Sequence, residues 1–464
     1  MSEVALGRIA GPFPYPPLPL FKCSPLSIRV KPSGKIRLLH DLSAPHNKLA
    51  VNANIPDSSA KVSYQNIDNV LDILKQHTIT HLAKSYISEA YRLIPLRPSE
   101  YHLTGFRIGN SYFYDRCLPM GARSSCLIFE RFSSGLKHAL ITRHGVEKVV
   151  KVLDDFLFLG SSEDECKRSL DSFVHLAAYT GVPLAQDKTV GPVKSLTFLG
   201  FAFDCTAYTI SIPEDKVRKY VARAREIIHA ASVTLKELQA MIGNLHFCVK
   251  VIKCGRCFLR NLITATRGNQ SPRRKIRVSS DMAEDLTVWM RFLSSANLKA
   301  ISSPIDPLPA PPNHFYSDSS GKGFGGVFGR KFLQGRFSPE WVDYDINVKE
   351  LYPMFLLLAV FGPSLKGERI IFHSDNKAAV ISLNHWTSRS KRMMAILRKM
   401  VQIALNYDLD CSAVHIKGVD NHLADTLSRF QVSKRFLAQA GLREEAVHVP
   451  FRLLPENWKL PPLS

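Results

Sequence analysis

Apolar and polar residues follow two kinds of pattern along this chain, and each pattern predicts its own kind of element. The run Lys151-Val-Leu-Asp-Asp-Phe-Leu-Phe-Leu-Gly160 places apolar residues on both sides of Asp154 and Asp155, which predicts buried strands. No Gly, Pro, Asn or Ser adjoins the pair to favour a solvated turn. Because buried carboxylates are costly without a counter-charge, we expect a hairpin tip that presents both aspartates to Mg²⁺, which prefers oxygen ligands.

The first half of the chain reads as short strands and helices in alternation. Residues 1–25 contain six prolines and predict an extended arm, and the β-rich runs on either side of Pro32-Ser-Gly34 predict a hairpin. The patterns that follow predict a helix over 62–76, a strand over 79–86, a turn into a short helix over 87–92, a hairpin over 106–117, helices over 124–138 and 163–180, and one β run over 196–203.

The second half begins with helices and returns to a mixed pattern. Helical spacing starts at Pro213, Thr234 and Glu237 form a capping box, and another helix is predicted from Asp281 to Ser294. Residues 302–313 contain five prolines, which predicts the main domain linker. Beyond it the order is β, β-hairpin, helix, β, helices, β and helix, ending near Phe430, and the last 34 residues show no clear site.

Charge and composition narrow the class of partner. The net charge of +21 favours a polyanion, with nucleic acid as the first candidate, and residues 250–277 hold nine basic residues and no acidic one. On a helix that segment would suit a phosphate backbone. We expect nine reduced cysteines, no membrane span, because no apolar run approaches about 20 residues, and a soluble intracellular chain.

Two further patterns suggest a zinc site and a dinucleotide-binding loop, but the details of the sequence favour neither. His246, Cys248, Cys254 and Cys257 are zinc-compatible, but the first two lie two residues apart and would point to different sides of a helix. The glycine-rich run from Gly323 to Gly329 has Phe at position 328 and no surrounding βαβ unit, so it predicts a hairpin rather than a dinucleotide loop.

Eight sequence blocks follow one another along the chain: Gly11-Pro-Phe13, Arg37-Leu-Leu-His-Asp-Leu-Ser43, Ala90-Tyr-Arg-Leu-Ile-Pro95, Leu118-Pro-Met-Gly121, Phe129-Glu-Arg-Phe132, Leu153-Asp-Asp-Phe156, Asp187-Lys-Thr189 and Leu196-Thr-Phe-Leu-Gly200. Together they resemble a reverse transcriptase followed by ribonuclease H, and most of all the polymerase of DIRS-like (tyrosine-recombinase) retrotransposons. The resemblance covers about residues 7–430.

The resemblance implies an α/β (α+β) fold, a right-hand polymerase with fingers, palm and thumb followed by a ribonuclease H-like domain with a five-stranded mixed sheet. The expected parts are a proline-rich arm (1–25), fingers and palm (26–205), a helical thumb or connection (206–301), a proline-rich linker (302–312), the ribonuclease H-like domain (313–430) and a C-terminal tail (431–464).

The resemblance also implies roles for residues of the polymerase half. Asp154 would be a metal ligand with Asp155 beside it, and Arg37 would hold the triphosphate. Tyr91 would exclude a ribose 2′-hydroxyl, Met120 and Gly121 would support base and template, and Lys188 would lie near the pyrophosphate leaving group.

One position departs from the family. Tyr86 stands where the family carries an aspartate, four residues before the Ala-Tyr-Arg block, with no gap to explain it. Two-metal catalysis needs carboxylates on both strands, and a phenol with a pKa near ~10 is neutral at pH 7. Glu89 lies three residues further on, on the following turn, and we do not expect it to replace the aspartate.

The second domain carries four carboxylates in family order. Asp318, Glu350, Asp375 and Asp425 match the residues by which ribonuclease H holds two magnesium ions against the RNA strand of a hybrid. Val419 stands where the mobile histidine of bacterial and retroviral enzymes would follow Gly418, and His415 is expected to lie on a strand.

The implied function is RNA-directed DNA synthesis with ribonuclease H. Its partners would be an RNA template, a DNA primer, an RNA–DNA hybrid and deoxynucleoside triphosphates, and its cofactor Mg²⁺ with Mn²⁺ as the alternative. Tyr86 predicts an impaired polymerase. A second hypothesis stays open, namely a decayed or co-opted nucleic-acid-binding protein that retains at most ribonuclease H activity.

Overall fold

The chain folds into two units. A computed structural model describes residues 2–30, 34, 36–268, 271–294, 312–458 and 460–461, without the side chains of Ile36, Arg37 and Val342. The first unit comprises Met1–Leu199 and Asp204–Ala207, and the second comprises Gly200–Phe203 and Tyr208–Ser464. Most of the linker predicted at 302–312 lies outside the described residues.

The N-terminal segment is not the extended arm that its prolines predict. It forms the short helix α1 (Ser2–Ala5) and the strand β1 (Ile9–Phe13), which pairs with β6 (Ser111–Asp115), and β6 also pairs with β5 (Gly105–Ile108). Glu3 forms an ion pair with Arg92, and Arg8 forms one with Glu89. These partners lie more than 80 residues away along the chain, so the local proline content gave no sign of them.

The predicted hairpin is present as β2 (Leu26–Val30) and β3 (Ile36–His40), which pair in antiparallel register. Its turn lies mostly outside the described residues. Between β3 and β5 the chain forms several helices, most of them short. They are η1 (Asn52–Asn54), η2 (Asp57–Ser59), α2 (Ile67–Gln76), η3 (Ala90–Leu93) and η4 (Pro98–Leu103).

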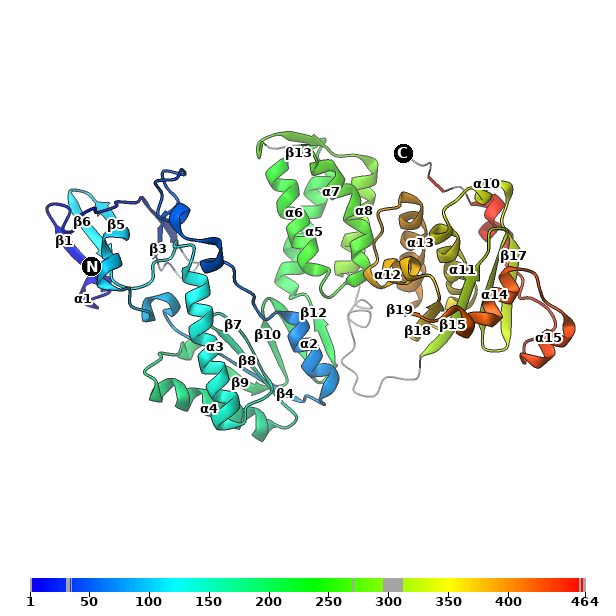
Figure 1. Cartoon of the computed structure of the whole chain (residues 1–464), viewed down its shortest axis with the longest axis horizontal. Helices are drawn as coiled ribbons and strands as arrows, with labels where there is room; N and C mark the ends of the chain where they lie inside the picture. The colour runs from blue at the N-terminus through cyan, green and yellow to red at the C-terminus, as the bar shows by residue number, and fades with distance from the viewer. Residues whose placement is uncertain are drawn as a thin grey trace. The chain divides into compact units, whose positions relative to one another are not determined.

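A four-stranded sheet forms the centre of the first unit (Figure 1). Its order is β7 (Val149–Val152), β8 (Asp155–Gly160), β4 (His81–Tyr86) and β9 (Val190–Val193), and the 3-10 helix η5 (Gln186–Lys188) precedes β9. Helices α3 (Ser125–His144) and α4 (Glu163–Tyr179) pack against it and bury Phe129, Phe156, Phe158 and Phe173. This packing fixes the two strands that carry the predicted palm residues.

The single β run predicted over 196–203 is two strands. β10 (Ser195–Phe198) and β11 (Phe201–Asp204) are separated by Leu199 and Gly200, whose φ angles of 48° and 80° reverse the chain. Glycine adopts a positive φ without strain, whereas Leu199 adopts it at a cost. The apolar residues on both sides of the turn gave no sign of it in the sequence. β12 (Thr209–Ser211) follows.

The second unit begins with a helical part: α5 (Glu214–His229), β13 (Ser232–Thr234), α6 (Leu235–Cys248), η6 (Lys253–Phe258), α7 (Arg260–Thr266), β14 (Lys275–Arg277) and α8 (Ser280–Ser294). The predicted capping box of Thr234 and Glu237 is present. The basic segment, expected on a helix, is instead divided between η6, α7 and β14.

A mixed five-stranded sheet completes the second unit. Its order is β17 (Lys331–Arg336), β16 (Gly323–Phe328), β15 (Asn313–Ser319), β18 (Arg369–Ser374) and β19 (Asp410–His415), with β15, β18 and β19 parallel. The sheet contacts α11 (Ile346–Phe361), α12 (Lys377–His385) and α14 (His422–Ser428), and α13 (Lys391–Tyr407) packs on α11. Shorter elements are α10 (Pro339–Val342), η7 (Gly362–Ser364), η8 (Gly418–Asn421), α15 (Lys434–Gln439), η9 (Phe451–Leu453) and η10 (Pro455–Asn457).

The helical part and the five-stranded domain are held together by buried polar contacts. Asp285 of α8 forms an ion pair with Arg398 of α13, and its side chain is fully buried. The thiol of Cys257 donates to the carbonyl of Trp386. Each contact joins a residue before the predicted linker to a residue after it, which explains why both parts belong to one unit.

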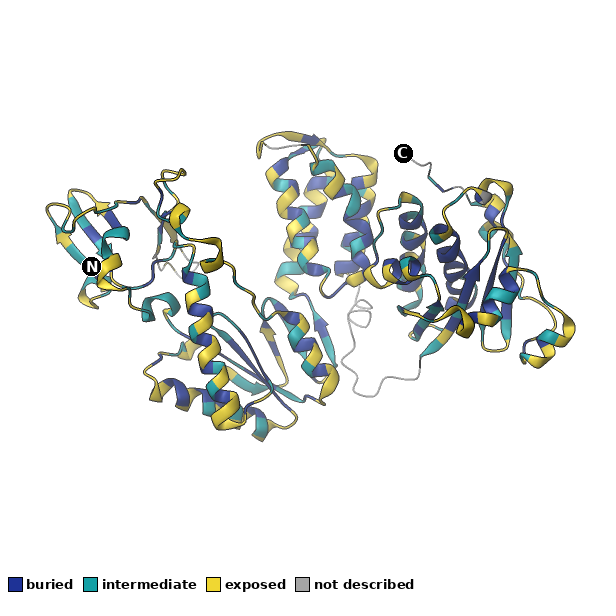
Figure 2. Cartoon of the chain, viewed as in Figure 1, coloured by how far each residue is buried: buried dark blue, intermediate teal, exposed yellow. Residues whose placement is uncertain are grey.

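Among the described residues, one helix is long and apolar enough to cross a membrane by length and composition alone. Residues Ile346–Ser364 reach a mean hydropathy of 1.2, but 72% of that window is buried inside the protein. Figure 2 shows α11 dark blue over most of its length. The helix is therefore apolar because it packs between the sheet and α13.

The C-terminal segment also packs, although no pattern in its residues indicated this. Trp458 lies against Phe355 and Tyr352, with ring centroids 4.5 and 5.6 Å apart. The indole of the buried Trp341 donates to the carbonyl of Pro455 at 3.1 Å. This segment is consequently part of the core of the second unit.

Candidate functional site

The first candidate site lies at the tip of the hairpin formed by β7 and β8. Asp154 occupies the turn and Asp155 begins β8, while Leu153 adopts a left-handed φ of 53°. Tyr86, at the end of β4, lies directly opposite Asp155 in the antiparallel ladder. The structure thus brings together the two strand ends that the family resemblance implied would meet.

A buried ion pair between Lys151 and Glu130 stabilises this hairpin. The Lys151 ammonium lies 2.6 Å from the Glu130 carboxylate and also donates to the Ser133 hydroxyl at 2.9 Å. The other carboxylate oxygen of Glu130 accepts the backbone N–H of Leu153 at 3.1 Å. Because that N–H belongs to the strained turn residue, Glu130 positions the turn that carries Asp154.

Two lysines accompany the Tyr86 ring. The ammonium of Lys188 lies 5.4 Å from the ring centroid and that of Lys84 lies 5.7 Å from it. Burial, together with the charges of Asp155 and Asp154, raises the pKa of Tyr86 to about 12. The phenol is therefore neutral at pH 7, and a neutral phenol is a poor ligand for Mg²⁺.

Asp155 responds to the same surroundings. Burial and the neighbouring charge of Asp154 raise its pKa to about 7, against the opposing effect of Lys188 and Lys84. Glu89 does not replace the missing aspartate, because its exposed carboxylate is bound to Arg8. In the described part of the chain, Asp154 and Asp155 belong to one hairpin and the facing strand end offers a phenol, so this set does not fit a pair of divalent ions.

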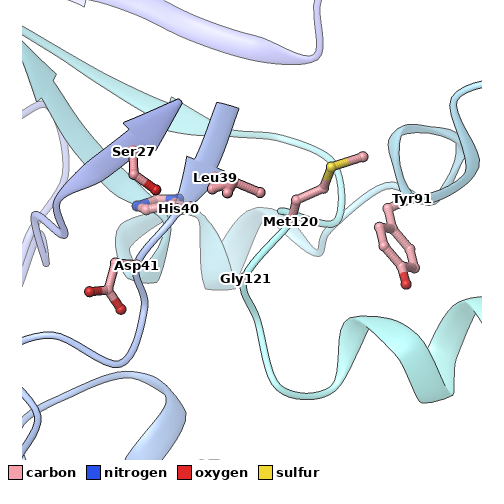
Figure 3. A pocket seen from close by; sticks show the side chains of 7 residues that line it. All are labelled: Ser27, Leu39, His40, Asp41, Tyr91, Met120 and Gly121. Carbon is pink, nitrogen blue, oxygen red and sulfur yellow. The ribbon is translucent and has the colours of Figure 1, made fainter. Parts of the chain in front are cut away.

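A pocket of about 450 Å³ lies in the same unit (Figure 3). Its lining consists of Ser27, Leu39, His40, Asp41, Tyr91, Met120 and Gly121. Three of the residues that the family resemblance assigned to nucleotide and template, Tyr91, Met120 and Gly121, thus meet at one cavity. The side chain of Arg37, assigned to the triphosphate, lies outside the described residues.

The pocket floor is held by backbone contacts. The N–H of His40 donates to the carbonyl of Met120 at 2.9 Å, and Gly121 has a φ of 144°. A side chain at Gly121 would collide with the carbonyl oxygen of His40, so only glycine permits this approach. Asn52 donates to the carbonyl of Gly121 at 2.9 Å and accepts the N–H of Arg123 at 2.9 Å.

The second candidate site is a cluster of carboxylates in the second unit. Oxygen atoms of Asp318, Glu350 and Asp375 lie within 4.8 Å of one another. Asp318 is near the end of β15, Glu350 is in the first half of α11, and Asp375 follows β18. Asp425, near the start of α14, adds its charge to the same electrostatic environment but directs one oxygen to Arg429 at 2.6 Å.

The electrostatics of this cluster fit a divalent cation. Burial and the charges of Asp318 and Asp375 raise the pKa of Glu350 to about 9. Within the described residues, one buried oxygen of Glu350 has no hydrogen-bond partner. Such an oxygen, beside two more hard carboxylate ligands, suits Mg²⁺ or Mn²⁺.

Two residues near the cluster had no assigned role. The hydroxyl of Ser428 donates to Asp318 at 2.6 Å, and this contact opposes the rise that burial causes in the Asp318 pKa. Ser428 follows Asp425 by three residues on one helix, a spacing that places both on the same face. His415 ends β19, as expected, and lies 3.0 Å from the Asp375 carbonyl.

Other contributing residues carried weak sequence signals. Glu130 lies in the Phe-Glu-Arg-Phe block, but nothing local indicated that Lys151, 21 residues later, would pair with it. Asn52 begins the short 3-10 helix η1, in a stretch of sequence without apolar periodicity. Each of these roles depends on contacts between segments that are distant in the sequence.

Comparison with known proteins relates part of the chain to one protein family. Residues 29–203 match the reverse transcriptase (RNA-dependent DNA polymerase) family. The Gag-Pro-Pol polyprotein of human T-cell leukemia virus 3 is 26% identical over 275 residues, which cover 57% of this chain and 17% of the polyprotein. The Pol polyprotein from Drosophila melanogaster transposon 297 is 21% identical over 399 residues, covering 83% and 34%. This chain therefore spans a small part of these relatives.

Among solved structures, foamy viral protease-reverse transcriptase dRH in complex with double-stranded DNA aligns with a TM-score of 0.53 at 16% identity, covering 89% of this chain and 68% of that one. This likeness confirms the predicted fold class, a right-hand polymerase followed by a ribonuclease H-like domain with a five-stranded mixed sheet. Residues 29–203 thus resemble a reverse transcriptase domain, and the chain is similar in sequence to parts of retroviral and retroelement polyproteins.

Proposed function

We propose that this chain is a retroelement-derived reverse transcriptase whose ribonuclease H half is competent and whose polymerase half is impaired. The observation that carries the first part is the convergence of Asp318, Glu350 and Asp375 within 4.8 Å, with a buried oxygen of Glu350 that no described group satisfies. The proposed substrate is the RNA strand of an RNA–DNA hybrid, and the proposed cofactor is Mg²⁺, with Mn²⁺ as the alternative.

In the ribonuclease H half, each carboxylate has a role that its position supports. Bound divalent ions would activate the attacking water and offset charge on the scissile phosphate. Asp318, held by Ser428, and Glu350 and Asp375 would bind and orient these ions, and Asp425 would complete the set. Arg429 lies beside Asp425, where its charge is available for the hybrid backbone.

In the polymerase half, Tyr86 supports the proposed impairment. Its neutral phenol lies opposite Asp155, where a carboxylate of the second strand would be needed. Asp154 and Asp155 would still face the primer terminus, while Tyr91, Met120, Gly121 and Arg37 would still bind nucleotide and template. Lys188 would approach the leaving pyrophosphate. We therefore propose that template, primer and deoxynucleoside triphosphate bind while nucleotidyl transfer is slow.

Nucleic-acid partners are supported by charge and by fold. The chain carries a net charge of +21, and the foamy viral structure with the same fold is a complex with double-stranded DNA. We propose an RNA template, a DNA primer and an RNA–DNA hybrid as partners. The sequence blocks support a DIRS-like origin, and we propose fingers and palm at 26–205, a thumb or connection at 206–301 and the ribonuclease H-like domain at 313–430.

A second candidate function is nucleic-acid binding without synthesis. Lys84 and Lys188, both within 6 Å of the Tyr86 ring centroid, place positive charge where metal ions would otherwise meet phosphate. A palm with this arrangement would hold a strand in the absence of divalent ions. This candidate retains at most the ribonuclease H activity.

One experiment separates these candidates. The purified chain is given a labelled RNA–DNA hybrid and, separately, a primed RNA template with deoxynucleoside triphosphates and Mg²⁺. The proposal expects RNA cleavage that EDTA abolishes, and very little primer extension. Rapid extension by the natural chain would contradict the proposed impairment, and absence of both activities would favour binding alone.

A further inference from the structure

A basic pocket lies in the second unit, between the turn that joins β16 to β17 and the segment that follows α15. Its volume is about 390 Å³, and it is lined by Phe328, Gly329, Arg330, Lys331 and Arg443. Three of these five residues are cationic and none is acidic. Two segments that lie more than 100 residues apart in the sequence therefore contribute charge of one sign to one cavity.

The pocket is separate from the carboxylate cluster. Asp318 pairs with Gly325 in the sheet, whereas Phe328 pairs with Phe315, three residues nearer the start of β15. At roughly 3.4 Å per residue, the pocket begins about 10 Å from Asp318 along the strands. The turn lies beyond Phe328, so the pocket is at the opposite end of β15 from the cluster.

Backbone contacts hold the cationic residues in place. The N–H of Arg443 donates to the carbonyl of Arg330 at 2.9 Å, and the Nε of Arg330 donates to the carbonyl of Gly441 at 3.1 Å. Leu442, between these residues, is buried in a core cluster with Val327. The segment that brings Arg443 to the turn is thus anchored independently of any ligand.

The cationic side chains of the pocket have no ion-pair partner among the described residues, although Glu444 and Glu445 follow Arg443 in the sequence. In the described part of the chain, no carboxylate forms an ion pair with Arg330, Lys331 or Arg443, and Lys331 instead lies 5.8 Å from the Phe361 ring centroid. Like charges close together repel, and a bound anion would remove that cost. Arginine presents a planar set of donors that matches the oxygens of phosphate.

From this arrangement we propose that the pocket binds a phosphate of a nucleic-acid backbone, at a place distinct from the carboxylate cluster. The exposed side chains of Arg330 and Arg443 leave the pocket open to solvent, so a continuous strand can enter and leave it. A backbone phosphate and a free phosphate share this chemistry, and competition by inorganic phosphate distinguishes them. Phosphate binding at this pocket does not depend on whether the protein synthesises DNA or cleaves RNA.

The test uses the full chain in EDTA and a fluorescein-labelled single-stranded DNA of about 12 nucleotides, within the site sizes of single-strand binders. Fluorescence anisotropy gives the dissociation constant as KCl is raised. Each phosphate that is no longer bound lowers the salt slope for a single strand by about 0.7. Because the pocket binds one phosphate, Arg330→Ser with Arg443→Ser should lower the slope by about 0.7. Arg443→Lys keeps the charge and should keep the slope.

The matched control replaces two exposed lysines of the same unit, Lys366→Ser with Lys399→Ser, which do not line the pocket. Thermal melting shows that each variant is folded. An unchanged slope in the arginine variant, or an equal loss in the control, would overturn the proposal. Inorganic phosphate that displaces the DNA from the natural chain far better than KCl of equal ionic strength, but not from the arginine variant, would assign the pocket to a free phosphate instead.

Discussion

Tyr86 and Asp155 face each other as direct partners across the antiparallel ladder of β4 and β8. Their adjacency makes residue 86 the position that decides whether both strand ends offer carboxylates. The neighbouring Lys84 and Lys188 remain near the ring and would also flank a shorter side chain. The consequences of this pairing are measurable in the natural chain.

We expect Tyr86→Asp to raise the rate of primer extension on an RNA template by at least ~100-fold, which corresponds to about 2.7 kcal/mol of barrier. The reason is that a second strand then contributes a carboxylate to the ions. Single-nucleotide incorporation with Mg²⁺ measures the rate. Tyr86→Asn supplies an oxygen without the charge and is the matched control.

Equal rates for the natural chain and Tyr86→Asp would show that residue 86 is outside the metal site. If neither chain extends a primer, the impairment has a cause other than Tyr86. Binding of a labelled primer–template should change little between the two chains, because the pocket formed by Tyr91, Met120 and Gly121 is untouched.

For the ribonuclease H-like domain, Asp375→Asn should lower Mg²⁺-dependent cleavage of RNA in a hybrid by at least ~100-fold, since a charged ligand is removed from the cluster. Gel analysis of end-labelled RNA gives the rate. Glu340→Gln, at an exposed position on α10, is the control and should leave cleavage unchanged. Cleavage that persists in EDTA would contradict the assignment.

Hybrid binding should also depend on the exposed basic residues before and within β14. Replacing Arg273, Arg274 and Lys275 with Ala should lower the salt slope of hybrid binding by roughly 0.7–0.9 for each phosphate that these side chains bind. Filter binding across a range of KCl gives the slope. The pair Lys366→Ala with Lys399→Ala provides the comparison, and an unchanged slope in the triple variant would exclude β14 from the interface.

The buried carboxylate of Asp285 predicts a specific pH dependence of stability. Burial, only partly offset by Arg398, raises its pKa to about 6 from an ordinary 3.8. The folded state therefore holds the proton more tightly than the unfolded state, so this stabilisation is complete below about pH 3.8 and is lost as the pH rises through about 6. The difference amounts to about 3 kcal/mol.

The check is the difference in unfolding free energy between the natural chain and Asp285→Asn, measured from pH 4 to pH 7. We expect the natural chain to lose stability relative to the variant across that range. A difference that is constant with pH would show that Asp285 titrates at its ordinary pKa. Asp410→Asn, which changes a partly exposed ion pair with Arg369, is the control.

Trp458→Ala should destabilise the second unit by about 2 kcal/mol, below the 3–5 kcal/mol typical of fully buried aromatics because Trp458 is only half-buried. The cause is the loss of its packing on Phe355 and Tyr352. Chemical denaturation monitors the change, with Phe451→Ala, a mostly exposed aromatic in the same segment, as the control. Equal stability of the two variants would contradict the packing role.

The sequence predicted those features that depend on local pattern. The Asp154–Asp155 hairpin, the β2–β3 hairpin, the capping box at Thr234 and the order of elements after residue 313 all follow from periodicity and turn chemistry. The four carboxylates of the second domain came from the family resemblance rather than from local pattern, although three of them lie at strand or helix ends beside apolar residues.

What the sequence did not reveal depends on long-range contacts. Glu3 and Arg8 anchor an N-terminal segment that its prolines suggested was free, and Ser428 acquires its role only because Asp318, 110 residues earlier, meets it. The turn at Leu199 and Gly200 was hidden because backbone angles, rather than side-chain polarity, determine it.

The packing of Trp458 also affects how the protein is made. Trp341 and Tyr352 are buried partly by residues about 100 positions later, so their hydrophobic surface remains uncovered while the intervening chain is being translated. The second unit cannot complete its core until residue 458 has left the ribosome tunnel. During that interval the rings of Trp341 and Tyr352 lack the cover that Trp458 later provides.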